Sequence, residues 1–178
     1  MIGWIVVAVA AVAVALLWLT NSRISRNLPR AGDPAPGFSL PDQNGIQHTL
    51  EEFRGKSLAL YFYPRDDTPG CAEQAMRFRN SMREIEALGA VVCGVSVDSS
   101  TSHAAFARKY QLPFTLLADR SGEVAARYGS LHNFGVIKFA KRNTFLIDAD
   151  GRIAKVYVGV NAGRNADEIM ADLKVQPS

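Results

Sequence analysis

The chain contains little cysteine and little histidine, and this scarcity excludes several classes of protein. Its 178 residues include two cysteines, Cys71 and Cys93, and three histidines. Two cysteines cannot hold together a small disulfide-rich scaffold. No histidine pairs with a cysteine at the spacing of a zinc site, so we expect no structural metal.

Beyond residue 30 the chain also lacks an excess of charge of either sign. Arg23, Arg26 and Arg30 crowd one short stretch. Without these three, 17 of the 20 basic residues remain, which equals the number of acidic residues. Nucleic acid binding depends on basic side chains that neutralise phosphates, so we expect no nucleic acid partner.

Residues 2–19 lack charge altogether and are almost wholly apolar. A helix of this length reaches roughly 27 Å, close to the thickness of about 30 Å of a bilayer's hydrocarbon core. Trp4 and Trp18 lie near its two ends, where membrane proteins often carry aromatic residues. We therefore predict one transmembrane helix over residues 1–20 and a single-pass membrane protein.

Two other interpretations of this segment remain open. A cleaved secretory signal would carry positive charge before the apolar run and small residues after it, and neither is present. A buried core helix is rarely apolar on all sides. Because the three arginines follow the run, we expect the globular part on the cytoplasmic side. The alternative is a periplasmic or secreted domain released by signal cleavage.

The remaining sequence predicts a linker over residues 21–35 and one domain over residues 36–178. The linker is polar and rich in proline and glycine. Asn44-Gly45 lies between two short runs and predicts a β-hairpin at the start of the domain.

Strand and helix signals then alternate along the domain. Buried strands are predicted over residues 57–64, 90–98 and 114–119, and helices over residues 71–88, 99–111 and 121–129, the last with Ser121 as its cap. A hairpin through Asp150-Gly151 and a helix over residues 166–175 close the chain. This order predicts an α/β protein of thioredoxin-like fold: a mixed central sheet flanked by helices, with an extra N-terminal hairpin.

The stretch "YFYPRDDTPGCAEQAM", residues 61–76, places Cys71 at a strand-to-helix corner. A thiolate reacts whereas a thiol hardly does, and free N–H groups at a helix start favour negative charge. Pro69 and Gly70 suit the turn, the Thr68 hydroxyl is near, and Pro64 shapes a small pocket. The alternative is that Cys71 fills space as a small buried side chain.

This stretch resembles the peroxidatic-cysteine motif of the peroxiredoxins, most closely the bacterioferritin-comigratory (Q-type) subfamily. The matching residues are Pro64, Thr68 and Cys71, and the similarity runs from about Gly32 to the carboxyl terminus. The later segment "RNTFLIDADGRI" belongs to it as well. The resemblance implies a catalytic site of Cys71, Thr68, Arg142 and Pro64.

The same resemblance implies a thiol-dependent peroxidase that acts in antioxidant defence. Cys71 would attack hydrogen peroxide or an alkyl hydroperoxide and become a sulfenic acid. A thiol reductant such as thioredoxin or glutaredoxin would restore it, with no cofactor or metal. We expect a monomer or weak dimer.

The chain departs from the subfamily where many members carry a second, resolving cysteine. Five residues after Cys71 stands Met76, which cannot form a disulfide. Cys93 falls in a predicted buried strand, so we expect a core thiol and a one-cysteine cycle.

Two rival functions remain. A membrane-anchored thiol-disulfide oxidoreductase would need Cys-x-x-Cys, and position 74 is Gln. A thioredoxin-fold redox sensor would use a persistent sulfenic acid as its signal.

Overall fold

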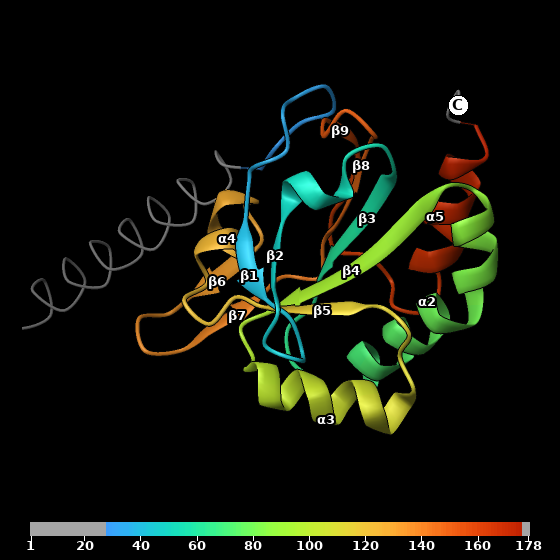
Figure 1. The fold of residues 1–178 in the computed structure, drawn as a ribbon. Helices are drawn as coiled ribbons and strands as arrows, with labels where there is room; N and C mark the ends of the chain where they lie inside the picture. The colour runs from blue at the N-terminus through green and yellow to red at the C-terminus, as the bar shows by residue number, and fades with distance from the viewer. Residues whose placement is uncertain (1–27, 176–178) are drawn as a thin grey trace, which may run out of the picture.

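The computed structural model describes residues 28–175 and has a five-stranded mixed sheet at its centre (Figure 1). The strand order is β5-β4-β3-β8-β9. The strands are β3 (Ser57–Phe62), β4 (Ala90–Ser96), β5 (Thr115–Ala118), β8 (Thr144–Ile147) and β9 (Ile153–Tyr157). β3 pairs in parallel with β4, which pairs in parallel with β5; β3 with β8 and β8 with β9 are antiparallel. The apolar sequences of β3 and β4 fit strands covered on both faces.

Helices and a short 3-10 turn cover the sheet. They are η1 (Leu50–Phe53), α2 (Pro69–Ala87), α3 (Ser100–Tyr110), α4 (Glu123–Arg127) and α5 (Asn165–Leu173). In Figure 1, α2 and α5 pack beside each other on one side of the sheet, and α4 lies on the other. The predicted cap of α4 is shifted by one residue. Gly122 holds the N-cap position in a left-handed conformation, and the Ser121 hydroxyl accepts from the Glu123 amide.

Two small hairpins lie outside the central sheet. The predicted N-terminal hairpin consists of β1 (Ser39–Pro41) and β2 (Gln47–Thr49). The second, which the sequence did not predict, is formed by β6 (Leu131–Asn133) and β7 (Lys138–Ala140). Its strands have three residues each, too short for a clear alternation of apolar and polar side chains.

The core consists of two clusters on opposite faces of the central sheet. One cluster contains Ala59 and Tyr61 of β3 together with buried residues of α2, α3 and α5. The other contains Leu58 and Leu60 of β3 together with residues of α4 and the hairpins. Successive strand residues point to opposite faces, so β3 supplies both clusters from one apolar run.

The thioredoxin-like fold with a mixed sheet, flanking helices and an N-terminal hairpin is therefore confirmed. The predicted transmembrane helix over residues 1–20 lies outside the described residues. Among residues 28–175, no helix combines the length and the apolar character needed to cross a bilayer. The domain boundary at residue 36 stays a prediction, although the Gly32 and Ala35 amides already donate to the β8–β9 hairpin, at Ile153 and Gly151.

Candidate active site

The corner between β3 and α2 places Cys71 in the first turn of a long helix. Thr68 is the N-cap residue and Pro69 begins the helix, two residues earlier than predicted. Proline suits this position because the first amides of a helix have no partner within it. Cys71 is therefore the third residue of α2, where free N–H groups and the helix dipole favour a negative charge.

Arg142 reaches this corner from the segment that joins β7 to β8. Its guanidinium donates from Nη2 to the Cys71 sulfur over 3.3 Å. Nη1 donates to the Gly70 carbonyl at 3.3 Å and to Oε1 of Gln74 at 2.7 Å. The missing side chain of Gly70 permits this approach, because a Cβ there would lie 3.2 Å from Nη2 of Arg142.

A buried network of amide groups holds Gln74 in place. Its Nε2 donates to Oδ1 of Asn165 at 2.9 Å, and the Thr144 hydroxyl donates to the same oxygen at 2.7 Å. All three side chains are fully buried. The network connects α2, β8 and α5. It holds in place the Gln74 side chain, whose Oε1 accepts the hydrogen bond from Arg142.

The loop before α2 is attached to α3 by two consecutive aspartates. Asp66 accepts hydrogen bonds from Tyr63 at 2.7 Å and Ser102 at 2.6 Å, and one of its oxygens lies 2.9 Å from Nδ1 of His103. Asp67, with φ of 56°, accepts from Lys109 on α3. These contacts hold a strained loop in one conformation beside Cys71.

The electrostatics of Asp66 follow from these contacts. Burial on its own would raise the pKa of the Asp66 carboxyl, but hydrogen bonds from His103, Ser102 and Tyr63 lower it below its usual value. A carboxylate beside the site is thereby kept ionised and engaged with α3. It is not directed at the sulfur.

Thr68 and Pro64 border the same corner without a direct contact to the sulfur among the described hydrogen bonds. The Thr68 hydroxyl donates to the Arg65 carbonyl at 3.2 Å. Its oxygen lone pairs are therefore available to accept a hydrogen bond from a substrate O–H. Pro64 follows the end of β3 and has no N–H to donate.

Cys93 lies on the other face of the sheet. Its strand position pairs with Leu60, and it packs in the cluster opposite the one that contains Cys71. Both thiols are free and about 1% exposed. Burial raises the pKa of the Cys93 thiol far above its usual value. A disulfide between them would have to pass through the sheet, so the structure does not bring the two sulfurs together.

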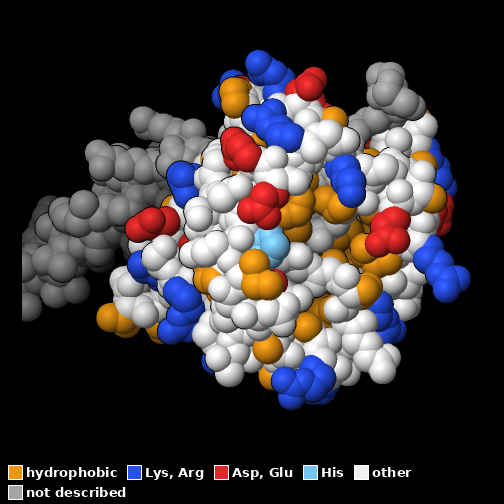
Figure 2. All heavy atoms as spheres, viewed as in Figure 1, with side chains coloured by type: hydrophobic (Ala, Val, Ile, Leu, Met, Phe, Trp, Pro, Cys, Tyr) orange, Lys and Arg blue, Asp and Glu red, His pale blue; other side chains and the backbone are white. Residues whose placement is uncertain are grey.

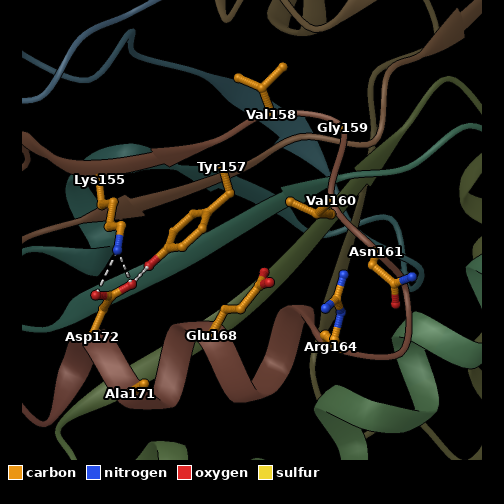
Figure 3. Close-up of a pocket in the computed structure, with 10 residues that line it drawn as sticks. All are labelled: Lys155, Tyr157, Val158, Gly159, Val160, Asn161, Arg164, Glu168, Ala171 and Asp172. Carbon is orange, nitrogen blue, oxygen red and sulfur yellow. Dashed lines mark hydrogen bonds and ion pairs between the residues drawn. The ribbon is translucent and has the colours of Figure 1, made fainter.

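A surface hollow of about 600 Å³ lies between β9 and α5 (Figure 3). Lys155 and Tyr157 of β9 both contact Asp172 of α5 at one end of it. The hollow does not include Cys71. Its connection to the site is the amide of Val160, which donates to the backbone carbonyl of Arg142.

The structure brings more polar residues to this corner than the sequence motif suggested. From the sequence alone, Gln74 is not distinguished from a surface residue, and Asn165, Thr144 and Asp66 are not singled out. A polar residue at a buried helix position is the signal that would have identified Gln74. Nothing in the sequence places Asn165, 91 positions away, against it.

This arrangement suits attack by a thiolate on a small electrophile. A guanidinium beside the sulfur stabilises negative charge and can donate further hydrogen bonds to an oxygen approaching it. The comparisons with known proteins agree with this chemistry. The model of the AhpC/TSA family matches residues 31–156.

Two curated relatives illustrate the similarity. A peroxiredoxin of the bcp type from Coxiella burnetii is 41% identical over 146 residues, which are 80% of this chain and 97% of the relative. The chloroplastic peroxiredoxin Q of Sedum lineare is 45% identical over 127 residues, which are 71% of this chain and 67% of the relative. The chain spans 58% of the wheat chloroplastic peroxiredoxin Q.

Solved structures show the same relationship. Peroxidoxin BcpB from Mycobacterium tuberculosis superposes with a TM-score of 0.80 at 32% identity, over 84% of this chain and 99% of that one. Xanthomonas campestris peroxiredoxin Q gives 0.73 at 31% identity, over 78% and 90%. This chain belongs to the AhpC/TSA family, in its peroxiredoxin Q/bcp subfamily, and is a thiol-dependent peroxidase.

Proposed function

We propose that Cys71 is the peroxidatic nucleophile of this peroxidase and that Arg142 activates both the sulfur and the peroxide. The observation that carries the proposal is the 3.3 Å hydrogen bond from Nη2 of Arg142 to the Cys71 sulfur at the start of α2. The thiolate attacks the terminal peroxide oxygen and the O–O bond breaks. The sulfur is oxidised to sulfenic acid, and the other oxygen takes a proton and leaves as water or an alcohol.

Thr68 and Pro64 shape the approach of the peroxide in this proposal. The Thr68 hydroxyl accepts from the O–H of the substrate while it donates to the Arg65 carbonyl. Arg142 stabilises the charge that develops on the leaving oxygen. Pro64 adds an apolar wall that offers no competing donor.

We propose hydrogen peroxide and alkyl hydroperoxides as substrates. A solved structure of the Xanthomonas campestris bacterioferritin comigratory protein, 29% identical to this chain, was described with alkyl peroxide reduction activity. The proposed site needs to contact only the hydroperoxide group, so it does not restrict the remainder of the substrate.

We propose a one-cysteine cycle in which an external thiol, such as that of thioredoxin or glutaredoxin, reduces the sulfenic acid through a mixed disulfide. Two observations support it. Met76 stands one helical turn after Cys71 in α2, and Cys93 packs on the opposite face of the sheet. Neither can serve as a resolving thiol in the folded protein.

We also propose that residues 1–20 anchor the enzyme in a membrane, with the domain on the cytoplasmic side, as a monomer or weak dimer. The uncharged run of residues 2–19 and the arginines that follow it support this placement. The proposed role is peroxide removal near the bilayer.

The test of the cycle is mass spectrometry of both sulfurs after treatment with one equivalent of peroxide. We expect one added oxygen on Cys71 and none on Cys93, followed by full recovery on addition of a thiol. An intramolecular disulfide between Cys71 and Cys93 would disprove the one-cysteine cycle. An unmodified Cys71 beside consumed peroxide would disprove the assignment of the nucleophile.

A further inference from the structure

We propose that the tip of the β6–β7 hairpin is a second membrane contact, which rests in the interface of an anionic bilayer beside the N-terminal anchor. The proposal rests on the proposed anchor but not on the assignment of the peroxidatic site. The partner that the hairpin tip contacts is a lipid surface.

The chemistry of the tip is that of an interfacial anchor. Phe134, Val136 and Ile137 are 64%, 99% and 61% exposed. They are three of the six large apolar side chains that are exposed among residues 28–175, and they fall within four consecutive positions. Single exposed apolar residues are common on soluble proteins, but such a group at one projecting turn marks an interaction site.

The hairpin presents these side chains on an ordered turn. The Phe134 amide donates to the Ile137 carbonyl at 2.9 Å, and Gly135 has the positive φ of 81° that a two-residue hairpin turn requires. The ring of Phe134 packs against His132 and Phe139, with centroids 6.0 Å from each. The exposure of the tip is therefore a property of a folded element.

The position of the tip matches the point at which the chain leaves the described domain. Gly129 precedes β6 by two residues, and a Cβ on it would lie 2.9 Å from the backbone of Leu28, the first described residue. The Tyr128 hydroxyl also donates to the Pro36 carbonyl at 2.7 Å. The seven residues between residue 20 and Leu28 allow at most about 28 Å from one to the other when fully extended. An anchor over residues 1–20 would thus keep the base of this hairpin close to the membrane surface.

The charge around the hairpin fits an anionic surface. The segment of residues 120–141 carries four basic residues and one acidic residue. They are Arg120, Arg127, Lys138 and Lys141, against Glu123. Figure 2 shows blue side chains beside the orange ones at the edge where Figure 1 places the turn between β6 and β7. Basic residues next to apolar ones attract anionic headgroups while the apolar side chains insert.

A second copy of the chain is a less suitable partner for the tip than a bilayer. A stable protein interface buries about 800 Å² on each partner, from roughly 20–30 residues a side. A four-residue tip supplies far less than this. Insertion into the interface of a bilayer requires only a few apolar side chains when another segment already holds the protein there.

The test measures contact between residue 136 and lipid in the full-length protein. The chain has two tryptophans, Trp4 and Trp18, which are both replaced by phenylalanine. Val136→Trp then reports on the tip. Val175→Trp is the matched control, because Val175 is 78% exposed and follows α5, which lies across the molecule from the hairpin in Figure 1. Both native cysteines remain, so peroxide turnover checks that each variant is folded.

The proteins are reconstituted into nanodiscs of phosphatidylcholine and phosphatidylglycerol, with and without bromine on the acyl chains. We expect brominated lipid to quench the emission of the Val136→Trp protein several-fold more than the emission of the Val175→Trp control. Replacing Phe134 and Ile137 by serine should reduce that quenching to the control value and leave turnover unchanged.

Two outcomes would overturn the contact while leaving the anchor and the peroxidase intact. The first is a protein that co-elutes with the discs but whose emission at position 136 is quenched no more than that of the Val175→Trp control. The second is an emission from position 136 that shifts to the blue without quenching by brominated lipid. That result would assign the tip to a protein interface. Failure to co-elute with the discs would overturn both the anchor and the contact, and turnover would still report on the peroxidase.

Discussion

The two cysteines of this chain are equally buried in apolar clusters, but only Cys71 accepts a described hydrogen bond from a charged side chain. Cys71 lies in the first turn of α2 and accepts a hydrogen bond from the Arg142 guanidinium. Cys93 is in the middle of β4, pairs with Leu60 and packs among apolar residues of the opposite cluster. The sheet separates them.

The comparison shows that two equally buried thiols can have different surroundings, and the proposed mechanism assigns reactivity to the one beside a guanidinium. Burial in apolar surroundings disfavours the thiolate, and this raises the pKa of Cys93. Cys71 differs in geometry: it lies at a helix start and accepts a hydrogen bond from the Arg142 guanidinium while it stays buried. Four predictions test this contrast through peroxide turnover and stability, from the largest expected loss to the smallest.

Removing the nucleophile should have the largest effect. Cys71→Ser should lower thiol-dependent peroxide consumption on the order of a thousandfold or more, since the hydroxyl has no comparable anionic form at neutral pH. The measurement is steady-state consumption with a thioredoxin system. Cys93→Ser is the matched control and should retain turnover within about twofold. Equal losses of turnover in the two variants would contradict the assignment of Cys71 and not Cys93 as the nucleophile.

Removing the guanidinium should make Cys71 behave more like Cys93. Arg142→Met should lower turnover by about 10²–10³-fold, because it removes a preorganised donor to the developing charge. Arg142→Lys keeps the charge but not the fork of N–H groups, so we expect partial recovery. At neutral pH, Cys71 should be alkylated more slowly in Arg142→Met than in the unmodified protein, as measured in a series of alkylation rates over pH. An unchanged rate would show that the helix start alone activates the sulfur.

Disturbing the positioning of Arg142 should have a smaller effect. Gln74→Ala removes the acceptor of the 2.7 Å bond from Nη1 and leaves Oδ1 of the buried Asn165 with the Thr144 hydroxyl as its remaining donor. We expect about a tenfold loss of turnover and a loss of unfolding free energy of about 1–3 kcal/mol. Gln74→Glu restores the acceptor and should recover turnover more than stability. Equal recovery of both would indicate a purely structural role.

Changes at Cys93 should affect stability with pH and leave turnover almost unchanged. Because the folded-state pKa of Cys93 is raised, the unfolded chain releases this proton first, at about pH 8.5. The unfolding free energy should therefore fall above that pH by up to about 1.4 kcal/mol per pH unit.

Cys93→Ala lacks this contribution, so the difference in stability between it and the unmodified protein should narrow as pH rises from about 8.5 to about 10. Cys71 is present in both proteins and its contribution cancels. Chemical denaturation at several pH values measures the difference. A constant difference would mean that Cys93 is exposed to solvent in the folded state.

Several features could be predicted from local sequence because they depend on neighbours along the chain. The apolar runs of β3 and β4, the glycine that ends α2 and the Asn44-Gly45 turn all act within a few residues. The motif from Pro64 to Cys71 is equally local, and so is the absence of a cysteine at Met76. The short β6–β7 hairpin was missed because its pattern covers too few residues to be distinguished from a loop.

The sequence by itself determined the fold class, the placement of Cys71 at a helix start and the lack of a second cysteine in that helix. Only the tertiary structure decided that Arg142 reaches the Cys71 sulfur, that Gln74 and Asn165 hold it there, and that Cys93 faces the other side of the sheet. These facts depend on residues far apart in sequence, which meet because the strands pair in one register and each strand turns alternate side chains to opposite faces.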